Sequence, residues 1–310
     1  MIKLSELALN IKIYLRRILY SLQYSIQLRA LRKSLNILSS EETVDKIIKD
    51  KLSVCRFGDG ELDMITSLSV GYDESRKSNF QNFDEKLALR LREILKAKNQ
   101  STANVLVCIP AVWKNSRPLE PKPKRFVERS FVNNSRMIHK SLNTDYVYGD
   151  SYFTRYYMDF RNKDKGAYIK HLQKIWDGRD LCIIEGTQSR LGVGNDLFSN
   201  ANSIVRILCP ALSAFSKYEE ILYAAKNISK DKLVLIALGQ TATVLAYDLA
   251  ENGYQAIDIG HIDVEYEWFL MKAKEKVALP NKFVNEVDDG RKFTQESNAS
   301  YLSEIVVQID

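Results

Sequence analysis

The chain is poor in the residues that build zinc sites, disulfide frameworks and membrane spans. Its 310 residues include four cysteines and three histidines, and no pair of cysteines has the spacing of a metal site. Uncharged apolar runs all fall short of the roughly 18 residues that a spanning helix needs. The N-terminus lacks the apolar core and small-residue cleavage site of a secretory signal. These absences predict a reduced, cytoplasmic protein without structural zinc.

The positive charge is concentrated in one segment. Residues 1–40 contain seven basic residues and one acidic residue, so they carry the whole net charge of +6, and the other 270 residues sum to zero. A nucleic-acid-binding protein more often carries its basic excess on the folded body, so no nucleic-acid partner is expected. The composition, 45% hydrophobic and 27% charged, is that of a soluble globular protein.

Residues 3–37 form a long helical pattern of leucine and isoleucine interleaved with Arg, Lys, Tyr and Gln, without Gly or Pro. A basic, apolar helix is typical of a membrane-surface anchor at the inner face of the cell membrane, with arginines reaching anionic headgroups. A helix packed on its own domain, or on a second subunit of a homo-oligomer, has the same periodicity. The chain is therefore divided into a basic amphipathic N-terminal helix, residues 1–38, and one domain, residues 39–310.

Short apolar runs alternate with helical patterns along the rest of the chain. Strands are expected at 52–55, 103–109, 181–184, 203–208, 233–238 and 256–259, and helices at 84–98, 217–227 and 241–252. Ser39 and Glu42 have the spacing of a capping box before another short helix. Residues 111–150 hold three prolines and a basic cluster and are expected to leave the core, with some helix around 125–140. Strands that are apolar throughout predict an α/β fold with a mostly parallel sheet covered on both faces.

The first candidate site is the glycine turn that follows the strand at 52–55. Asp59 lies between Gly58 and Gly60, and Glu61 follows Gly60, so the two acids are two positions apart. In an extended turn, both carboxylates point the same way and reach one divalent cation. Such hard oxygen ligands suit Mg²⁺ or Mn²⁺, which usually share their other positions with substrate phosphates. Most Asp-x-Glu triplets are solvated loop charges, but the position after a strand favours a metal site.

Two further glycine-rich strand ends are candidate phosphate sites. Gly239-Gln240-Thr241 opens a helix, where free backbone N–H groups and the helix dipole attract anions; an ordinary capped helix looks the same. The loop after residue 184 contains Gly-x-Gly, but Leu197 stands where a dinucleotide fingerprint requires its third glycine, so NAD is not expected. Arg190 in this loop would neutralise a diphosphate, or it would simply be solvated.

The fourth strand end is acidic. His261 follows it, and Asp263, Glu265 and Glu267 alternate with apolar residues before Trp268. If the segment is extended, the three acids share one face, either as a metal and base cluster or as a solvated strand face. Trp268 would stack on a sugar or base, or be buried.

The four motifs together resemble the bacterial GT-D type glycosyltransferases. They are found, in this order, at 56–61, 189–196, 238–248 and 260–268, and the resemblance covers roughly residues 40–290. It implies a Rossmann-like fold and transfer of a hexose, glucose or galactose, from a UDP-sugar. The implied acceptor is an oligosaccharide, a glycopeptide or a lipid-linked glycan in surface polysaccharide or adhesin glycosylation.

The resemblance also implies roles for individual residues. Asp59 and Glu61 would hold Mn²⁺ or Mg²⁺. The base would lie in the acidic stretch, at Glu265 with Asp263 and Glu267 as rivals and His261 beside them. The nucleotide would contact six residues: Arg56, Gly58, Arg190, Gly239, Gln240 and Thr241. One departure is Gln240, which stands where a proline is expected.

Two other classes of function fit the same sequence. One is a nucleotide-binding, phosphoryl-transfer protein on the same sheet. The other is a non-catalytic scaffold held at a membrane surface by residues 1–37.

Overall fold

The computed structural model describes residues 4–72, 80–96, 104–161, 164–287, 290 and 298–310. Its centre is a nine-stranded sheet of order β1-β4-β3-β2-β8-β7-β5-β6-β9, in which each neighbouring pair runs parallel. The strands are β1 (Asn36–Ile37), β2 (Ser53–Arg56), β3 (Val105–Ile109), β4 (Val147–Asp150), β5 (Asp180–Gly186), β6 (Ser203–Cys209), β7 (Leu233–Ala237), β8 (Ala256–Asp258) and β9 (Ile305–Gln308).

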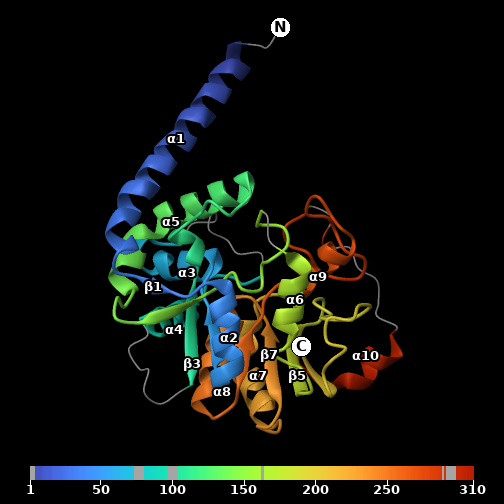
Figure 1. Cartoon of the computed structure of the whole chain (residues 1–310). Helices are drawn as coiled ribbons and strands as arrows, with labels where there is room; N and C mark the ends of the chain where they lie inside the picture. Colours follow the sequence, from blue (N-terminus) through green and yellow to red (C-terminus); the bar gives the residue numbers. More distant parts are fainter. Residues whose placement is uncertain (1–3, 73–79, 97–103, 162–163, 288–289, 291–297) are drawn as a thin grey trace.

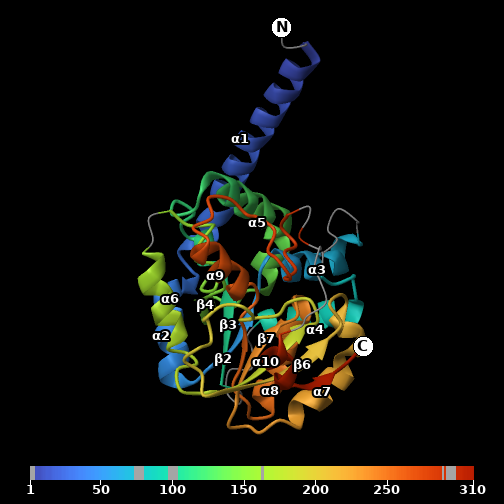
Figure 2. The ribbon, with the colours of Figure 1, turned by 90° about the vertical axis from the view of Figure 1, so that its right-hand side faces the viewer.

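Helices cover both faces of this sheet (Figures 1 and 2). They are α1 (Leu4–Arg32), α2 (Ser40–Asp50), α3 (Asp59–Val70), α4 (Glu85–Leu95), α5 (Pro121–Ser141), α6 (Lys165–Gln173), α7 (Tyr218–Lys226), α8 (Gln240–Glu251), α9 (Ile262–Leu270) and α10 (Ala299–Glu304). The predicted α/β class with a mostly parallel sheet is confirmed. The capping box at the start of α2 is present as expected, with Ser39 Oγ accepting from the Glu42 N–H at 3.1 Å.

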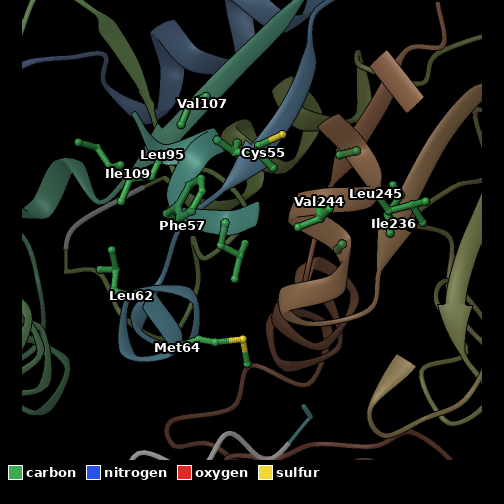
Figure 3. Packing of buried hydrophobic residues seen from close by; sticks show 14 of the residues in the cluster. Cys55, Phe57, Leu62, Met64, Leu95, Val107, Ile109, Ile236, Val244 and Leu245 are labelled. Carbon is green, nitrogen blue, oxygen red and sulfur yellow. The ribbon is translucent and has the colours of Figure 1, made fainter. Parts of the chain in front are cut away.

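The alternation of side chains along the strands divides the core into two layers. Cys182 and Ile184 of β5 face a layer that contains α3, α4, α5, α7 and α8, part of which is shown in Figure 3. Leu181 and Ile183 face the other layer, which contains α2 and α6. A strand buried on both faces must be apolar at every position, and for this reason these strands are recognisable in the sequence.

The C-terminal part of α1 belongs to this core, whereas the described side chains at 11–19 are exposed. Tyr24 and Leu28 are buried, and the Tyr24 hydroxyl donates to the Trp113 carbonyl at 2.8 Å. The Tyr24 ring contacts Phe131 of α5, with 5.3 Å between ring centroids. The N-terminal part projects from the body in both views (Figures 1 and 2). No described helix combines the length and the apolar character that crossing a membrane requires.

The segment expected to leave the core contributes a strand instead. Val147–Asp150 forms β4 in the sheet, and residues 121–141 form one long helix, α5. The sequence of β4 conceals the strand because it contains a glycine and an acid among four residues. Gly149 is required by packing, since a Cβ there would lie 2.5 Å from Cys108 Sγ.

Candidate active site

A cavity of about 1400 Å³ lies at the carboxyl ends of the central strands. Its lining comes from the residues after β2, β5, β7 and β8, and from α5. Strand β2 pairs with β3, the next strand along the chain, on one side, and with β8, from the C-terminal half of the chain, on the other. Ligands of open α/β sheets bind at such a reversal of strand order. The four predicted strand-end motifs thus meet at one cavity.

The Asp59 turn is helical, so the prediction of an extended turn is wrong. Gly58 is the N-cap of α3, and Asp59 is its first residue. Side chains two positions apart in a helix diverge by roughly 200°. Glu61 turns back, and its Oε2 accepts the Gly58 N–H at 2.8 Å. Both carboxylates nevertheless line the cavity.

Burial makes this end of the cavity unfavourable for negative charge. It raises the pKa of Glu61 to about 7. The nearby Asp258 carboxylate adds to this rise, whereas the hydrogen bond from the Gly58 N–H opposes it. Asp59 faces the open cavity, but the surrounding protein still raises its pKa, against the opposing charge of Arg155. Bringing a cation to these carboxylates would relieve both effects.

The residues present fit a cation that obtains most of its ligands from a substrate. The described residues contain no group of three or more His, Cys, Asp or Glu side chains placed to hold a metal. Asp59 and Glu61 supply two carboxylates, and one oxygen of Glu61 caps the helix. Two carboxylates completed by phosphate oxygens and water are a common environment for Mg²⁺.

Arg56, predicted to bind the nucleotide, is held by the protein itself. Its Nη2 lies 3.0 Å from Asp258 Oδ1, and its Nη1 donates to Thr154 Oγ1 at 2.8 Å. Gly260 has a φ of +46°, and a Cβ there would lie 1.8 Å from Arg56 Nη2, so this position requires glycine. Asp258 was not predicted, although an acid inside the apolar run 256–259 is a usable signal.

The predicted phosphate site at the start of α8 is only partly open to the cavity. Gly239 has a φ of +55°, and a Cβ there would approach Phe80 to 3.0 Å. Gln240 lines the cavity and is 3% exposed, and within the described residues its Oε1 has no hydrogen-bond partner. Thr241 is buried, and its hydroxyl donates to Gln81 Oε1 at 3.2 Å.

The acidic stretch after β8 is also helical, so the three acids do not share one face. Asp263 and Glu267 are one turn apart in α9, and Lys282 Nζ lies 2.7 Å from each. Glu265 points elsewhere and accepts the N–H groups of Tyr157 and Met158 at 2.8 and 3.0 Å. Asp263 lines the cavity, whereas Glu265 and Glu267 do not.

His261 and Asp263 are the members of the predicted catalytic group that line the cavity. Asp263 is paired with Lys282, whereas His261 forms no ion pair with the described residues. Burial, together with the charge of Arg155, lowers its pKa to about 3, so the imidazole is neutral at physiological pH. Arg155 itself forms a 2.6 Å ion pair with Glu286. Burial would raise the pKa of Glu286, but Arg155 and Lys276 outweigh it and hold the pKa below its usual range.

The cluster around Arg155 was missed in the sequence. Lys276 Nζ lies 3.2 Å from both Asp159 and Glu286, and all four residues line the cavity. They come from segments without a motif, so only their proximity in the fold reveals them. The one available signal was the tyrosine-rich stretch around 152–157, which contains Arg155.

Two predicted ligand contacts lie away from the cavity. Arg190 does not line it; it is 5% exposed, and its Nη1 donates to the Asn281 carbonyl at 2.9 Å. Trp268 is fully buried, and its Nε1 donates to the Val277 carbonyl at 3.0 Å. Both side chains therefore stabilise the loop at 277–282, and the buried alternative for Trp268 is correct.

The fold and the cavity define an α/β protein with a polar ligand site at the carboxyl edge of a parallel sheet. The family model described as glycosyltransferase GT-D fold matches residues 54–287. The chain belongs to this family, as the resemblance in its motifs implied.

Known relatives support this assignment. The chain is 37% identical over 297 residues to "Glycosyltransferase GlyD" of Streptococcus pneumoniae, a match over 94% of this chain and 35% of the relative. It is 35% identical over 278 residues to "Probable glycosyl transferase Gly" of Streptococcus gordonii, over 89% of this chain and 39% of the relative. The chain thus spans little more than a third of the length of these curated relatives.

Solved structures have the same fold. One, described as the highly conserved domain of unknown function 1792 with a distinct glycosyltransferase fold, has a TM-score of 0.83 and 39% identity, over 93% of this chain and all of that one. Another, described as a new glycosyltransferase from Streptococcus sanguinis, has a TM-score of 0.79 and 36% identity, over 89% of this chain and all of that one.

Proposed function

We propose that this protein is a metal-dependent glycosyltransferase that moves a hexose, glucose or galactose, from a UDP-sugar to a glycan acceptor. The observation that carries the proposal is the position of Asp59 and Glu61. In a GT-D family member, both carboxylates line the large cavity at the strand ends, and burial raises the pKa of each. This is the environment in which a divalent cation with a diphosphate would be stabilised.

Mn²⁺ or Mg²⁺ would be held by Asp59 and Glu61. When bound, such an ion supplies Lewis-acid stabilisation of the charge that develops on departing UDP. Gly239 and Gln240 at the start of α8 line the cavity, where the positive end of the helix dipole would attract a phosphate. Gln240 lines the cavity there, and a ribose or sugar hydroxyl would supply the donor that its Oε1 lacks among the described residues.

The acceptor hydroxyl would meet the neutral imidazole of His261. Because its pKa is lowered to about 3, His261 is free to accept a hydrogen bond from that hydroxyl at physiological pH. Asp263 is neutralised by Lys282, and Glu265 holds the backbone at 157–158. These placements favour positioning roles for Asp263, Glu265 and Glu267, in place of the base role expected for Glu265.

The exposed part of α1 would hold the enzyme at the inner face of the cell membrane. Leu15, Leu19, Leu22 and Ile26 are each more than half exposed, and residues 7–40 contain no acid. An apolar helix surface interleaved with arginines suits an interface of anionic lipids.

The test is a screen of UDP-hexoses with Mn²⁺, with UDP release measured for the wild type, Asp59→Asn and the control Glu275→Gln. Glu275 is an exposed carboxylate on the rim of the same cavity. UDP release by the wild type and the control, with a loss of at least about a hundredfold in Asp59→Asn, is expected. No release with any UDP-hexose, or equal release by Asp59→Asn, would overturn the proposal. Phosphate-ester hydrolysis in place of sugar transfer would support a phosphoryl-transfer protein.

A further inference from the structure

The cavity has a positively charged wall that the proposed donor site does not use. It is formed by α5, where Lys122, Arg125 and Arg129 line the cavity. Their spacings of three and four residues place them on one face of the helix. All three are exposed. Within the described residues they form no ion pair, whereas Lys124 on another face of the helix lies 3.9 Å from Glu128.

Lys122 and Arg125 lie near the N-terminal end of α5, where the helix dipole disfavours positive charge. Helix α5 begins at Pro121, and its first turn contains no acidic residue. Its N-cap, Glu120, also lines the cavity, but its carboxylate is paired with Arg161 at 3.3 Å. The N-terminal end of a helix has a partial positive charge that repels Lys122 and Arg125. An anionic ligand would remove this repulsion and would be attracted by the side chains and the helix end together. This arrangement favours a phosphate or diphosphate group on this wall.

The same wall has an apolar part and lies next to α1. Phe126 is 42% exposed in the cavity wall, with the Arg129 guanidinium carbon 5.8 Å from its ring centroid. The inner side of α5 packs on α1, where Phe131 contacts Tyr24. Both views place α5 at the end of the body from which α1 projects (Figures 1 and 2). Helix α5 therefore connects the cavity to the helix with the exposed apolar surface.

We infer that the acceptor is a lipid-linked glycan whose diphosphate lies against Lys122, Arg125 and Arg129. The inference rests on the proposed function and deepens it by selecting one acceptor class. A neutral oligosaccharide would leave the three cations without a counter-charge. A lipid chain attached to the diphosphate would extend along Phe126 toward the membrane surface at α1.

The chemical balance of the reaction is unaffected by this group. The acceptor hydroxyl forms the new bond to the anomeric carbon, and its proton passes to the His261 imidazole that accepts its hydrogen bond and from there to water. The bond from that carbon to UDP breaks, and UDP leaves with the electron pair. The acceptor diphosphate only binds, so its contacts set the affinity for the acceptor and not the affinity for the donor.

The experiment measures binding of farnesyl diphosphate to protein saturated with UDP and Mn²⁺, which occupy the donor site. The variant is the double substitution Arg125→Gln and Arg129→Gln, and the matched control is Arg136→Gln with Lys140→Gln. Arg136 and Lys140 are exposed cations of the same helix that do not line the cavity. Thermal unfolding of each variant establishes that the fold is intact.

Binding of farnesyl diphosphate by the wild type is expected to be weakened at least about tenfold in the Arg125 and Arg129 variant and to be unchanged in the control. Inorganic pyrophosphate is expected to bind more weakly than farnesyl diphosphate. Equal binding by the variant and the wild type, or equal binding of the two probes, would overturn the inference.

The donor side is measured separately. The KM for the UDP-hexose in UDP release is expected to be the same in the wild type and the Arg125 and Arg129 variant. A rise in this KM that matches the loss of farnesyl diphosphate binding would assign the α5 cations to the donor and refute the inference. Absence of UDP release from the wild type, with farnesyl diphosphate binding intact, would refute the proposed function alone.

Discussion

Arg56 at the end of β2 forms an ion pair with Asp258 at the end of β8, with 3.0 Å between Nη2 and Oδ1. The two side chains are 15% and 4% exposed. They join the two strands at which the order of the sheet reverses, directly beneath the cavity. This pair therefore fixes the geometry of the strand ends from which α3 and α9 begin.

Substituting one partner of this pair should destabilise the protein strongly. In Arg56→Gln, the buried Asp258 carboxylate loses its counter-charge, and the free energy of unfolding should fall by about 3 kcal/mol. The double variant Arg56→Gln with Asp258→Asn should recover part of this loss. Urea unfolding of the two single variants and the double variant measures the coupling, and strictly additive losses would show that the pair makes no net contribution.

A second buried charge cluster holds α9 in place. Lys282 forms ion pairs with both Asp263 and Glu267, so Lys282→Met should lower the free energy of unfolding by about 3 kcal/mol or more. Because the substitution leaves two carboxylates without a counter-charge, the loss should shrink at acidic pH. Unfolding at two pH values checks this, and a loss of equal size at both would contradict the electrostatic explanation.

The pH dependence of stability should contain a contribution from Glu265. Burial, with the charge of Asp159, raises its pKa from 4.5 to about 7. As the pH rises, the unfolded chain releases this proton before the folded protein does. The free energy of unfolding therefore falls between about pH 4.5 and pH 7 and stays lower above pH 7. The slope is on the order of 1 kcal/mol per pH unit.

The matched variant is Glu265→Gln, whose amide oxygen is able to accept the same two N–H groups. Its unfolding free energy should depend less on pH in this window than that of the wild type. Parallel stability curves for the two proteins would mean that Glu265 ionises normally in the folded state.

The exposed surface of α1 gives a test that leaves the core intact. Deleting residues 1–37 would also remove Tyr24 and Leu28, which are buried. The better variant is Leu19→Gln with Leu22→Gln, which should weaken binding to vesicles containing phosphatidylglycerol at least about tenfold. Leu302→Gln, which changes an exposed leucine of α10, is the control. Cosedimentation that is the same for all three proteins would contradict membrane binding through this surface of α1.

The sequence revealed the fold wherever a strand is buried on both faces. Leu181–Ile184 is such a strand, because the core on each side requires an apolar residue at every position. Strand β4 gave no such signal, since Gly149 is present to accommodate Cys108 Sγ. That requirement exists only once β3 and β4 are paired.

The prediction that the four motifs lie at strand ends agrees with the fold, whereas the predicted extended geometry of two of them does not. Glycines after the strands marked the cavity edge, and four strand-end motifs do meet there. The spacing of Asp59 and Glu61 is the same in a turn and in a helix, so the sequence alone did not reveal that α3 begins at Asp59. Arg155 and Glu286 are 131 positions apart, and only tertiary packing brings them together.

We propose that Asp59 and Glu61 form a metal site that the diphosphate of the donor completes. Calorimetric titration of Mn²⁺ into the protein, with and without saturating UDP, tests it most directly. The wild type should bind Mn²⁺ much more tightly in the presence of UDP. Under the same conditions, the affinity of Asp59→Asn for Mn²⁺ should be at least about tenfold lower. Mn²⁺ binding that is the same with and without UDP, or equally tight in Asp59→Asn, would show that these carboxylates do not form such a site.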